Sequence, residues 1–228
     1  MNKELLAELI GIILGDGNLH KKSNCITITG SLEDLHYYEL IVIPLFQDLF
    51  SKIPKLRKRN DRNSYYLQLE NKTIFDILLS CGLRRGNKTE NASIPQFIIS
   101  NKKLIKHFLR GLFDTDGCLK FSKQSRNTYY YPRIQIGLKE SALSLGIRAL
   151  LKKLEFNFSQ YKDKKDLIYY QISGKKNLEK WMREIGSNNP VHKTKYLVWK
   201  KQGFYMPKSS LESRLKTLDL NKNFILSQ

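Results

Sequence analysis

The chain has 228 residues, which is enough for one large domain or two small ones with a buried core. It carries 40 Lys and Arg residues against 21 Asp and Glu residues, a formal net charge of +19. This surplus predicts a polyanionic partner. We expect nucleic acid and no membrane, because the basic residues are spread along the chain without a long basic amphipathic helix.

The cysteines Cys25, Cys81 and Cys118 are odd in number and include no Cys-x-x-Cys pair. A disulfide framework or a zinc ribbon is therefore not expected, and a reducing intracellular compartment fits, whether cytoplasm or organelle. The first residues have the pattern of neither a signal peptide nor a membrane span, since no stretch reaches the roughly 18 apolar residues that a span needs.

The first predicted element is a helix over residues 5–14, where apolar residues recur at helical spacing. In a strand expected over 25–29, Ile26 and Ile28 share one face and leave Thr27 and Thr29 on the other. The remaining elements expected in this half are a helix over 32–50, strands around 55–59 and 64–70, and a closing helix.

The same order of elements recurs about a hundred residues later. The elements expected there are a helix over 104–113, a strand over 133–136, a helix over 141–154, strands around 157–161 and 167–173, and a closing helix. The aligned pairs are Asp16 with Asp116 (116 − 16 = 100), Gln68 with Gln171 (171 − 68 = 103) and Lys88 with Lys193 (193 − 88 = 105). Three blocks in one order at a nearly constant offset predict a tandem duplication.

The order α-β-β-α-β-β-α, present twice, predicts an α+β fold of two pseudo-symmetric halves, each an antiparallel four-stranded sheet with helices on one face. We expect an N-terminal half over residues 1–100 and a C-terminal half over 101–205, joined by a linker over 91–103. The tail over 206–228 has the pattern of a late helix or an ordered arm.

The helices over 5–14 and 104–113 end in similar stretches, LIGIILGDG and LRGLFDTDG. Gly11 and Gly15 are four residues apart in the first, and Gly111 and Thr115 occupy the same places in the second. Small residues at this spacing let two helices meet backbone to backbone. The two helices are therefore expected to pack on each other about a pseudo-twofold axis, with both C-termini at the same end.

Each stretch closes on an acid, Asp16 or Asp116, followed by Gly17 or Gly117, which suits the left-handed position after a helix. A carboxylate beside the unpaired carbonyls of a helix C-terminus is unfavourable. Two such ends brought together offer oxygen ligands to a hard divalent cation, which explains the repeated acid. The alternative is that each Asp-Gly only marks a tight turn. An EF-hand is excluded, because its later ligands are missing.

These two stretches resemble the motif of the LAGLIDADG homing endonuclease family. The matching residues are Leu9, Gly11, Asp16 and Gly17 in the first copy and Leu109, Gly111, Asp114, Asp116 and Gly117 in the second. Leu14 stands where the family name has an acid, at a position that is not the metal ligand in the family. Two motifs in one chain resemble the single-chain members, which implies a monomer whose two sheets form a saddle over DNA.

The resemblance implies roles for individual residues by position. Asp16 and Asp116 would bind the metal, and the carbonyls of Gly15 and Thr115 would add ligands. The lysines that would act near the scissile phosphates are Lys88 and Lys193, with Lys139 as a weaker candidate whose counterpart in the first half is not basic.

The expected activity is hydrolysis of one phosphodiester bond in each strand of a long, non-palindromic DNA target, leaving 3′ overhangs. Mg²⁺ would supply the metal chemistry, Mn²⁺ could replace it, and Ca²⁺ is expected to support binding without cleavage. No Ser-His-Asp or Cys-His pattern in the sequence supports covalent catalysis.

DNA binding is expected on the helix-free faces of the two sheets. The candidates for reading base edges are Thr27, Thr29, Gln68, Gln135, Tyr169 and Gln171. The candidates for phosphate contacts are Lys21, Lys22, Arg57, Lys58, Arg59, Arg62, Lys120, Lys123, Arg126, Arg133, Lys162, Lys164 and Lys165.

Alternatives remain open from the sequence. One is an RNA-splicing maturase that binds its own intron RNA, and another is a non-catalytic DNA-binding regulator of the same fold, which would be expected to have lost one of the acids. A third alternative is a basic structural protein, but the repeated acids would have no purpose in it. The chain begins at Met1 with no intein splice-junction residues evident, which favours a free-standing intron-encoded protein.

Overall fold

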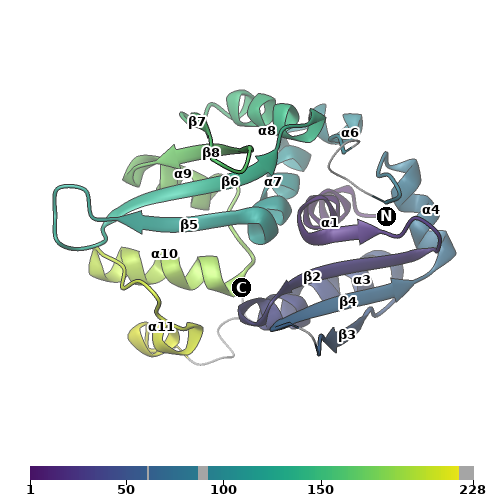
Figure 1. Ribbon diagram of the computed structural model, residues 1–228, viewed down its shortest axis with the longest axis horizontal. Helices are drawn as coiled ribbons and strands as arrows, with labels where there is room; N and C mark the ends of the chain where they lie inside the picture. The colour runs from purple at the N-terminus through teal and green to yellow at the C-terminus, as the bar shows by residue number, and fades with distance from the viewer. Residues whose placement is uncertain (61, 87–91, 221–228) are drawn as a thin grey trace.

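The computed structural model describes residues 1–60, 62–86 and 92–220. They form two halves, each with a four-stranded antiparallel sheet and helices against it (Figure 1). The predicted α+β fold of two repeated halves is confirmed. None of the described helices combines the length and the apolar character that a membrane crossing requires.

The first half follows the predicted order of elements. Its regular elements are α1 (Lys3–Asp16), β1 (Gly17–Leu19), β2 (Cys25–Ser31), a helical segment, β3 (Lys55–Lys58), β4 (Ser64–Glu70) and α4 (Lys72–Ser80). The strands lie in the order β1-β2-β4-β3. Ile26 and Ile28 of β2 point into the core, while Thr27 and Thr29 lie half-buried on the other face, as the alternation predicts.

The helix predicted over 32–50 is not a uniform α-helix. It consists of a 3-10 turn (Leu32–Asp34), α2 (Leu35–Tyr37), a π-helical turn (Tyr38–Val42) and α3 (Ile43–Phe50). Pro44 at the start of α3 gives a physical reason. Proline has no N–H to donate and its ring crowds the carbonyl four residues earlier, here that of Leu40, so the preceding turn widens.

The second half repeats the first. Its elements are α7 (Lys102–Asp116), β5 (Gly117–Ser122), β6 (Tyr131–Lys139), α8 (Ala142–Lys153), β7 (Ser159–Lys162), β8 (Leu167–Ser173) and α9 (Lys175–Glu184), with strand order β5-β6-β8-β7. Gln68 pairs with Thr27 in the first sheet, and Gln171 pairs with Gln135 in the second. The strand pairing therefore places the two glutamines in equivalent positions, as the repeat alignment predicts.

Further helices extend this repeat. A short helix, α6 (Gln96–Ile99), lies in the predicted linker, and α11 (Leu211–Thr217) is the late helix expected in the tail. The helix α10 (Pro190–Gln202) is not among the predicted elements. Its signals are local: Asn189 caps its start, Pro190 occupies the first turn, and Gly203 ends it with φ 75°.

The halves join through α1 and α7, which run side by side at the centre of the molecule (Figure 1). A Cβ atom on Gly11 would lie 2.2 Å from the carbonyl oxygen of Phe108, and one on Gly111 would lie 2.2 Å from that of Glu8. Glu8 and Phe108 are equivalent in the repeat, so the contact is reciprocal. This reciprocity confirms the close backbone packing about a pseudo-twofold axis.

Gly17 and Gly117 do not adopt the predicted left-handed conformation. Their φ angles are −87° and −88°, so the chain is extended and passes directly from each motif helix into a strand. Glycine is needed for space instead. A Cβ atom at Gly17 would lie 2.7 Å from the carbonyl oxygen of Ile13, and one at Gly117 would lie 2.4 Å from that of Phe113.

Candidate active site and nucleic-acid interface

The parallel packing of α1 and α7 brings the two motif acids to the same end of the helix pair. Gly15 and Thr115, the residues before the acids, face each other so closely that a Cβ atom on Gly15 would lie 2.0 Å from the Thr115 Oγ1. The half-buried Asp16 and Asp116 therefore leave adjacent helix ends, one from each half.

The donors at this place suit a hard cation, because carboxylate and carbonyl oxygens are the ligands that such ions prefer. Within the described residues, no group of three or more His, Cys, Asp or Glu side chains is arranged to hold a metal ion. A metal between Asp16 and Asp116 would therefore complete its coordination with backbone carbonyls, water or substrate oxygens. A catalytic metal site needs coordination positions that water or substrate can occupy.

Asp116 and Lys139 line the same open depression of about 180 Å³, together with Leu14 of the opposite helix. The weaker lysine candidate thus lies beside a motif acid. The strand pairing identifies the residue of the first half that is equivalent to Lys139. Gly17 pairs with Ile28 and Gly117 pairs with Ile136, so Ile28 and Ile136 are equivalent positions.

The residue three places after Ile28 is Ser31, and the residue three places after Ile136 is Lys139 (28 + 3 = 31; 136 + 3 = 139). The Ser31 hydroxyl donates to the Asp34 carboxylate at 2.7 Å. The two halves therefore differ in charge at this equivalent position, with a lysine in one and a serine in the other.

Lys193 lies half-buried in the first turn of α10. Burial lowers its pKa and so does the nearby Arg110 charge, whereas the charges of Asp114 and Glu8 oppose the change. A lysine with a lowered pKa gives up its proton more readily near neutral pH. Lys88, its counterpart in the repeat, lies outside the described residues.

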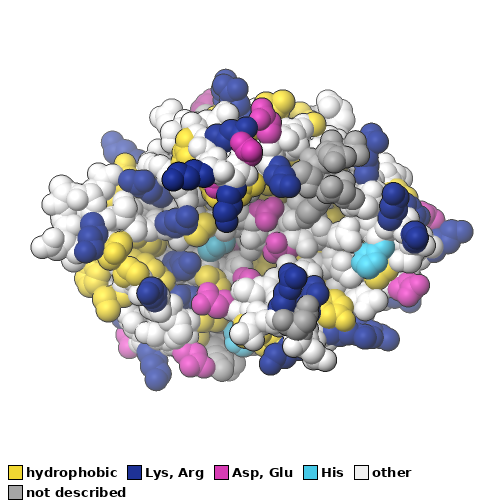
Figure 2. Space-filling model, in the orientation of Figure 1, with side chains coloured by type: hydrophobic (Ala, Val, Ile, Leu, Met, Phe, Trp, Pro, Cys, Tyr) yellow, Lys and Arg dark blue, Asp and Glu magenta, His cyan; other side chains and the backbone are white. Residues whose placement is uncertain are grey.

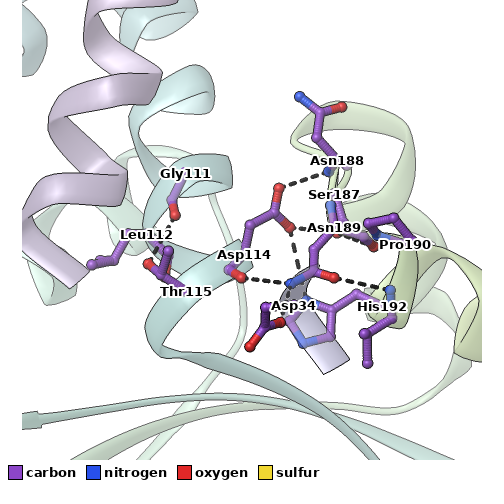
Figure 3. Close-up of polar contacts among 12 residues, drawn as sticks. Asp34, Gly111, Leu112, Asp114, Thr115, Ser187, Asn188, Asn189, Pro190 and His192 are labelled. Carbon is purple, nitrogen blue, oxygen red and sulfur yellow. Dashed lines mark hydrogen bonds and ion pairs between the residues drawn. The ribbon is translucent and has the colours of Figure 1, made fainter. Parts of the chain in front are cut away.

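The start of α10 is fixed by Asp114, a buried acid of α7 to which the sequence assigns no catalytic role. Asp114 is 2% exposed. Its carboxylate accepts the Ser187 hydroxyl and the Asn188 backbone N–H, the latter at 2.7 Å, and its carbonyl accepts the Asn189 side-chain amide at 2.9 Å (Figure 3). The loop that precedes the Lys193 helix is therefore held against the second motif helix.

The same loop also contacts the first half. The Asn189 amide donates to the Asp34 carboxylate at 3.0 Å, and the Asn188 amide donates to the Glu8 carboxylate at 2.6 Å. Glu8 also forms an ion pair with Arg110. Burial alone raises the pKa of Glu8, but hydrogen bonds from His107, Arg110 and Asn188 hold it below its usual value.

The helix-free face of the first sheet brings several predicted DNA contacts together. An open depression of about 470 Å³ is lined by Thr27, Thr29, Lys58 and Arg59, and also by His20, Asn60 and Tyr66. Tyr66 pairs with Thr29 across the sheet, and the His20 Nε2 lies 3.2 Å from the Thr27 Oγ1. His20, Asn60 and Tyr66 are not among the DNA contacts predicted from the sequence. Alternation along β4 places Tyr66 on the same face as Gln68 and could have indicated it.

The equivalent face of the second sheet is closed by its own side chains. The Gln135 side-chain amide donates to the Tyr161 hydroxyl at 2.6 Å and to the Gln171 side-chain oxygen Oε1 at 2.7 Å. Tyr161 also stacks on Tyr169, with ring centroids 5.2 Å apart. Gln135 is consequently only 7% exposed, whereas strand alternation predicts an open base-reading residue there.

The remaining candidates for DNA contact are half-buried or exposed side chains on strands and hairpins. They are Lys21 and Lys22 before β2, Arg57 in β3, Arg62 before β4, Gln68 in β4, Lys120, Lys123 and Arg126 in β5 and the turn after it, Arg133 in β6, and Lys162, Lys164 and Lys165 around the β7–β8 turn. Figure 2 shows acidic side chains near the middle of the displayed face and basic side chains around them.

Residues 103–186 match the family model of the LAGLIDADG-like domain. The fold matches the crystal structure of I-DmoI in complex with DNA and Mn, with a TM-score of 0.57 and 19% identity over 81% of this chain and 97% of that chain. It also matches full-length DUF199/WhiA from Thermatoga maritima, with a TM-score of 0.57 and 18% identity over 95% of this chain and 66% of that chain. Residues 103–186 therefore form a LAGLIDADG-like domain, and the described chain has the two-domain fold of these LAGLIDADG structures.

Curated proteins with unrelated names are similar to parts of the chain. The replication factor C small subunit of Methanocaldococcus jannaschii is 32% identical over 149 residues, which are 61% of this chain and 8% of that protein. The glutamine–fructose-6-phosphate aminotransferase of the same organism is 27% identical over 187 residues, which are 79% of this chain and 16% of that protein. The chain thus spans less than a fifth of the length of these relatives.

Proposed function

We propose that this protein is a site-specific endonuclease that hydrolyses one phosphodiester bond in each strand of a long double-stranded DNA target. The observation that carries the proposal is the contact between Gly15 and Thr115, which puts Asp16 and Asp116 at adjacent helix ends. Two carboxylates from opposite halves, placed between two basic sheet faces, suit a reaction on two strands of one duplex.

Asp16, Asp116 and the carbonyls of Gly15 and Thr115 would hold divalent metal, with Mg²⁺ as the expected ion. Bound there, the metal would polarise the scissile phosphate and lower the pKa of the attacking water. The I-DmoI structures with DNA that resemble this fold contain Mn or Ca, which supports a divalent metal here. We expect Mn²⁺ to replace Mg²⁺, and Ca²⁺ to permit binding only.

The three candidate lysines would act on the phosphate rather than on the metal. Lys139, which shares a depression with Asp116, would offset negative charge on the scissile phosphate in one strand. Lys193, with its lowered pKa, would orient or deprotonate the attacking water. Lys88, its counterpart in the sequence repeat, would have the same role for the other strand.

The two sheet faces differ, which supports a non-palindromic target. Thr27 and Gln68 pair in the first sheet and would meet bases there, whereas the equivalent Gln135 in the second sheet is covered by Tyr161 and Gln171. The basic residues around them would contact phosphates and set the affinity for duplex DNA. The expected products are double-strand breaks with 3′ overhangs, made by a monomer.

The curated relatives support a mobile genetic origin. A replication factor subunit and an aminotransferase carry out different activities, yet each resembles more than half of this chain within a small part of its own length. A shared segment of this kind favours a module that enters unrelated genes. Homing is the corresponding activity of a site-specific endonuclease. That the host of this chain is an intron is a separate proposal, because the matching segments of these relatives lie within their own polypeptides.

Selection of cleaved sequences from a randomised duplex library tests the proposal. The purified protein is incubated with the library in Mg²⁺, in Ca²⁺ and in EDTA, and the ends of cut molecules are sequenced. We expect one long consensus cut in both strands with 3′ overhangs in Mg²⁺ only. Tight duplex binding without cleavage in any divalent metal would contradict the enzyme and support a DNA-binding regulator. Tight binding to intron RNA alone would support a maturase.

A further inference from the structure

Residues of β5, of α10 and of the segment that leads to α11 line a second basic depression. Figure 1 shows where these elements lie. It measures about 310 Å³, and neither motif acid lines it. Four of its lining side chains are basic, namely Lys120, Lys195, Lys208 and Arg214, and one is acidic, Glu33. The lining therefore has a formal charge of +3 (4 − 1 = 3).

Arg214 is the unusual member of this lining, because it is only 2% exposed. Its Nε donates to the Thr194 Oγ1 at 2.8 Å, and its Nη1 donates to the Ser209 carbonyl oxygen at 2.5 Å and to the Tyr205 hydroxyl at 3.2 Å. All three acceptors are neutral. Within the described part of the chain, the Arg214 Nη2 is buried without a hydrogen-bond partner.

A buried guanidinium with only neutral acceptors is unfavourable, because burial removes the hydration of the charge and none of these acceptors carries a negative charge. Lys120, Lys195 and Lys208 around the same depression add repulsion. An anion in the depression would relieve both effects. A phosphate group suits such a place, because it offers several acceptor oxygens to guanidinium and ammonium donors.

The walls of the depression are already formed. Phe121 of β5 stacks on Tyr205 with ring centroids 5.0 Å apart, and the Tyr205 backbone N–H donates to the Tyr129 carbonyl oxygen at 2.8 Å. The Ser209 hydroxyl donates to the Tyr205 hydroxyl at 2.9 Å. These contacts dock the segment after α10 on the β5–β6 hairpin, so a ligand would not have to order it.

We propose that this depression binds a phosphate group, and that the group is a backbone phosphate of bound DNA. Lys120 places it beside the DNA, because β5 begins directly after Asp116 and Lys120 pairs with Arg133 on the neighbouring strand. Glu33 belongs to the first half, so the depression opens between the halves. The assignment to DNA rests on the proposed function, whereas the phosphate site itself does not.

The double variant Lys195→Gln/Lys208→Gln tests the site, with Lys216→Gln as the control. Lys216 is an exposed lysine on α11 that does not line the depression. Binding to a duplex is measured by fluorescence anisotropy over a series of salt concentrations in Ca²⁺. Each lost phosphate contact lowers the slope of log K against log salt by about 0.9. We expect that reduction in the double variant and an unchanged slope in the control.

Inorganic phosphate is titrated separately, without DNA or divalent metal, at constant ionic strength. The ³¹P resonance of phosphate should broaden in the presence of the wild-type protein or of Lys216→Gln, and phosphate should raise the Tm of both proteins. Neither effect should occur with the double variant. Added duplex should displace it. The variant Arg214→Lys, which keeps the charge but loses the guanidinium geometry, should weaken phosphate binding while the protein stays folded by circular dichroism.

An unchanged salt slope together with no phosphate binding would overturn the proposal. Phosphate binding that duplex DNA fails to displace would overturn the assignment to DNA and leave a site for a free phosphate. Because neither measurement uses cleavage, a protein that binds phosphate here but cuts no DNA would contradict the endonuclease and not this site.

Discussion

The side-chain amide of Asn188 donates to the Glu8 carboxylate at 2.6 Å, across a sequence separation of 180 residues. The backbone N–H of Asn188 donates to the Asp114 carboxylate at 2.7 Å. One loop residue of the second half therefore joins two buried acids, one on each motif helix. The centre of the molecule is held by polar contacts as well as by apolar packing.

Replacing Asn188 with alanine should destabilise the protein. The change leaves Glu8 without one of its buried donors, and an unsatisfied buried polar group of this kind costs about 1–3 kcal/mol. Urea unfolding measures the loss. Asn157→Ala, at an exposed position, is the control and should change the unfolding free energy by less than about 0.5 kcal/mol. Equal effects of the two variants would contradict the importance of this contact.

Stability should also depend on the ionisation of Glu8. Its pKa is lowered in the folded protein, so the charged form contributes stability above the unfolded pKa, and that contribution is lost as the pH falls through the lowered folded value. The variant Glu8→Gln should be less stable than wild type near neutral pH, and the difference should shrink in acid. A difference that stays constant with pH would show that the Glu8 charge does not matter.

Gly111→Ala should disturb the joint between the halves. The new Cβ atom would lie 2.2 Å from the Glu8 carbonyl oxygen, a backbone atom that cannot move without shifting α1. We expect the free energy of unfolding, measured with urea, to fall by about 1–3 kcal/mol.

Gly146→Ala in α8 is the matched control for that variant. There the nearest atom is the Ile94 Cδ1 at 2.8 Å, the end of a flexible side chain that can turn away. Alanine is also the better helix former, so this substitution should have a much smaller effect. If Gly146→Ala destabilised the protein as much as Gly111→Ala, backbone packing would not be the reason.

Asp114→Asn should alter cleavage of one DNA strand more than the other. The Asp114 charge raises the pKa of Lys193, so removing it should lower that pKa further and move the corresponding limb of the pH–rate profile to lower pH. Strand-specific nicking of a doubly labelled duplex measures both profiles in one reaction. The strand served by the first half is the internal control, and equal shifts in both strands would contradict this role for Asp114.

The motif helices and their contact could be predicted because the signals are local and occur twice. Gly11 and Gly111 stand at equivalent places, and small residues at helical spacing have few explanations besides close packing. The two glutamines that align in the sequence also align in the sheets. The extended conformation of Gly17 was not predictable from an Asp-Gly pair, because it depends on the strand that follows directly.

The features that escaped prediction depend on contacts between distant residues. Asp114 looks like a second motif acid in the sequence, and only the loop over 187–189, about 75 residues later, gives it partners. Lys139 is a weak catalytic candidate in the sequence because its counterpart, Ser31, is not basic. In the fold, however, Lys139 and Asp116 line the same depression. Gln135 looks open by strand alternation, but Tyr161 and Gln171 cover it.

Asp16 and Asp116 together are proposed to hold the metal that supports DNA cleavage. The most direct measurement is cleavage of the selected target in Mg²⁺ by wild type, Asp16→Asn and Asp116→Asn, with duplex binding in Ca²⁺ measured alongside. We expect each variant to bind the duplex still and to lose on the order of 10²-fold or more in cleavage rate. Double-strand cleavage at the wild-type rate by either variant would contradict this role.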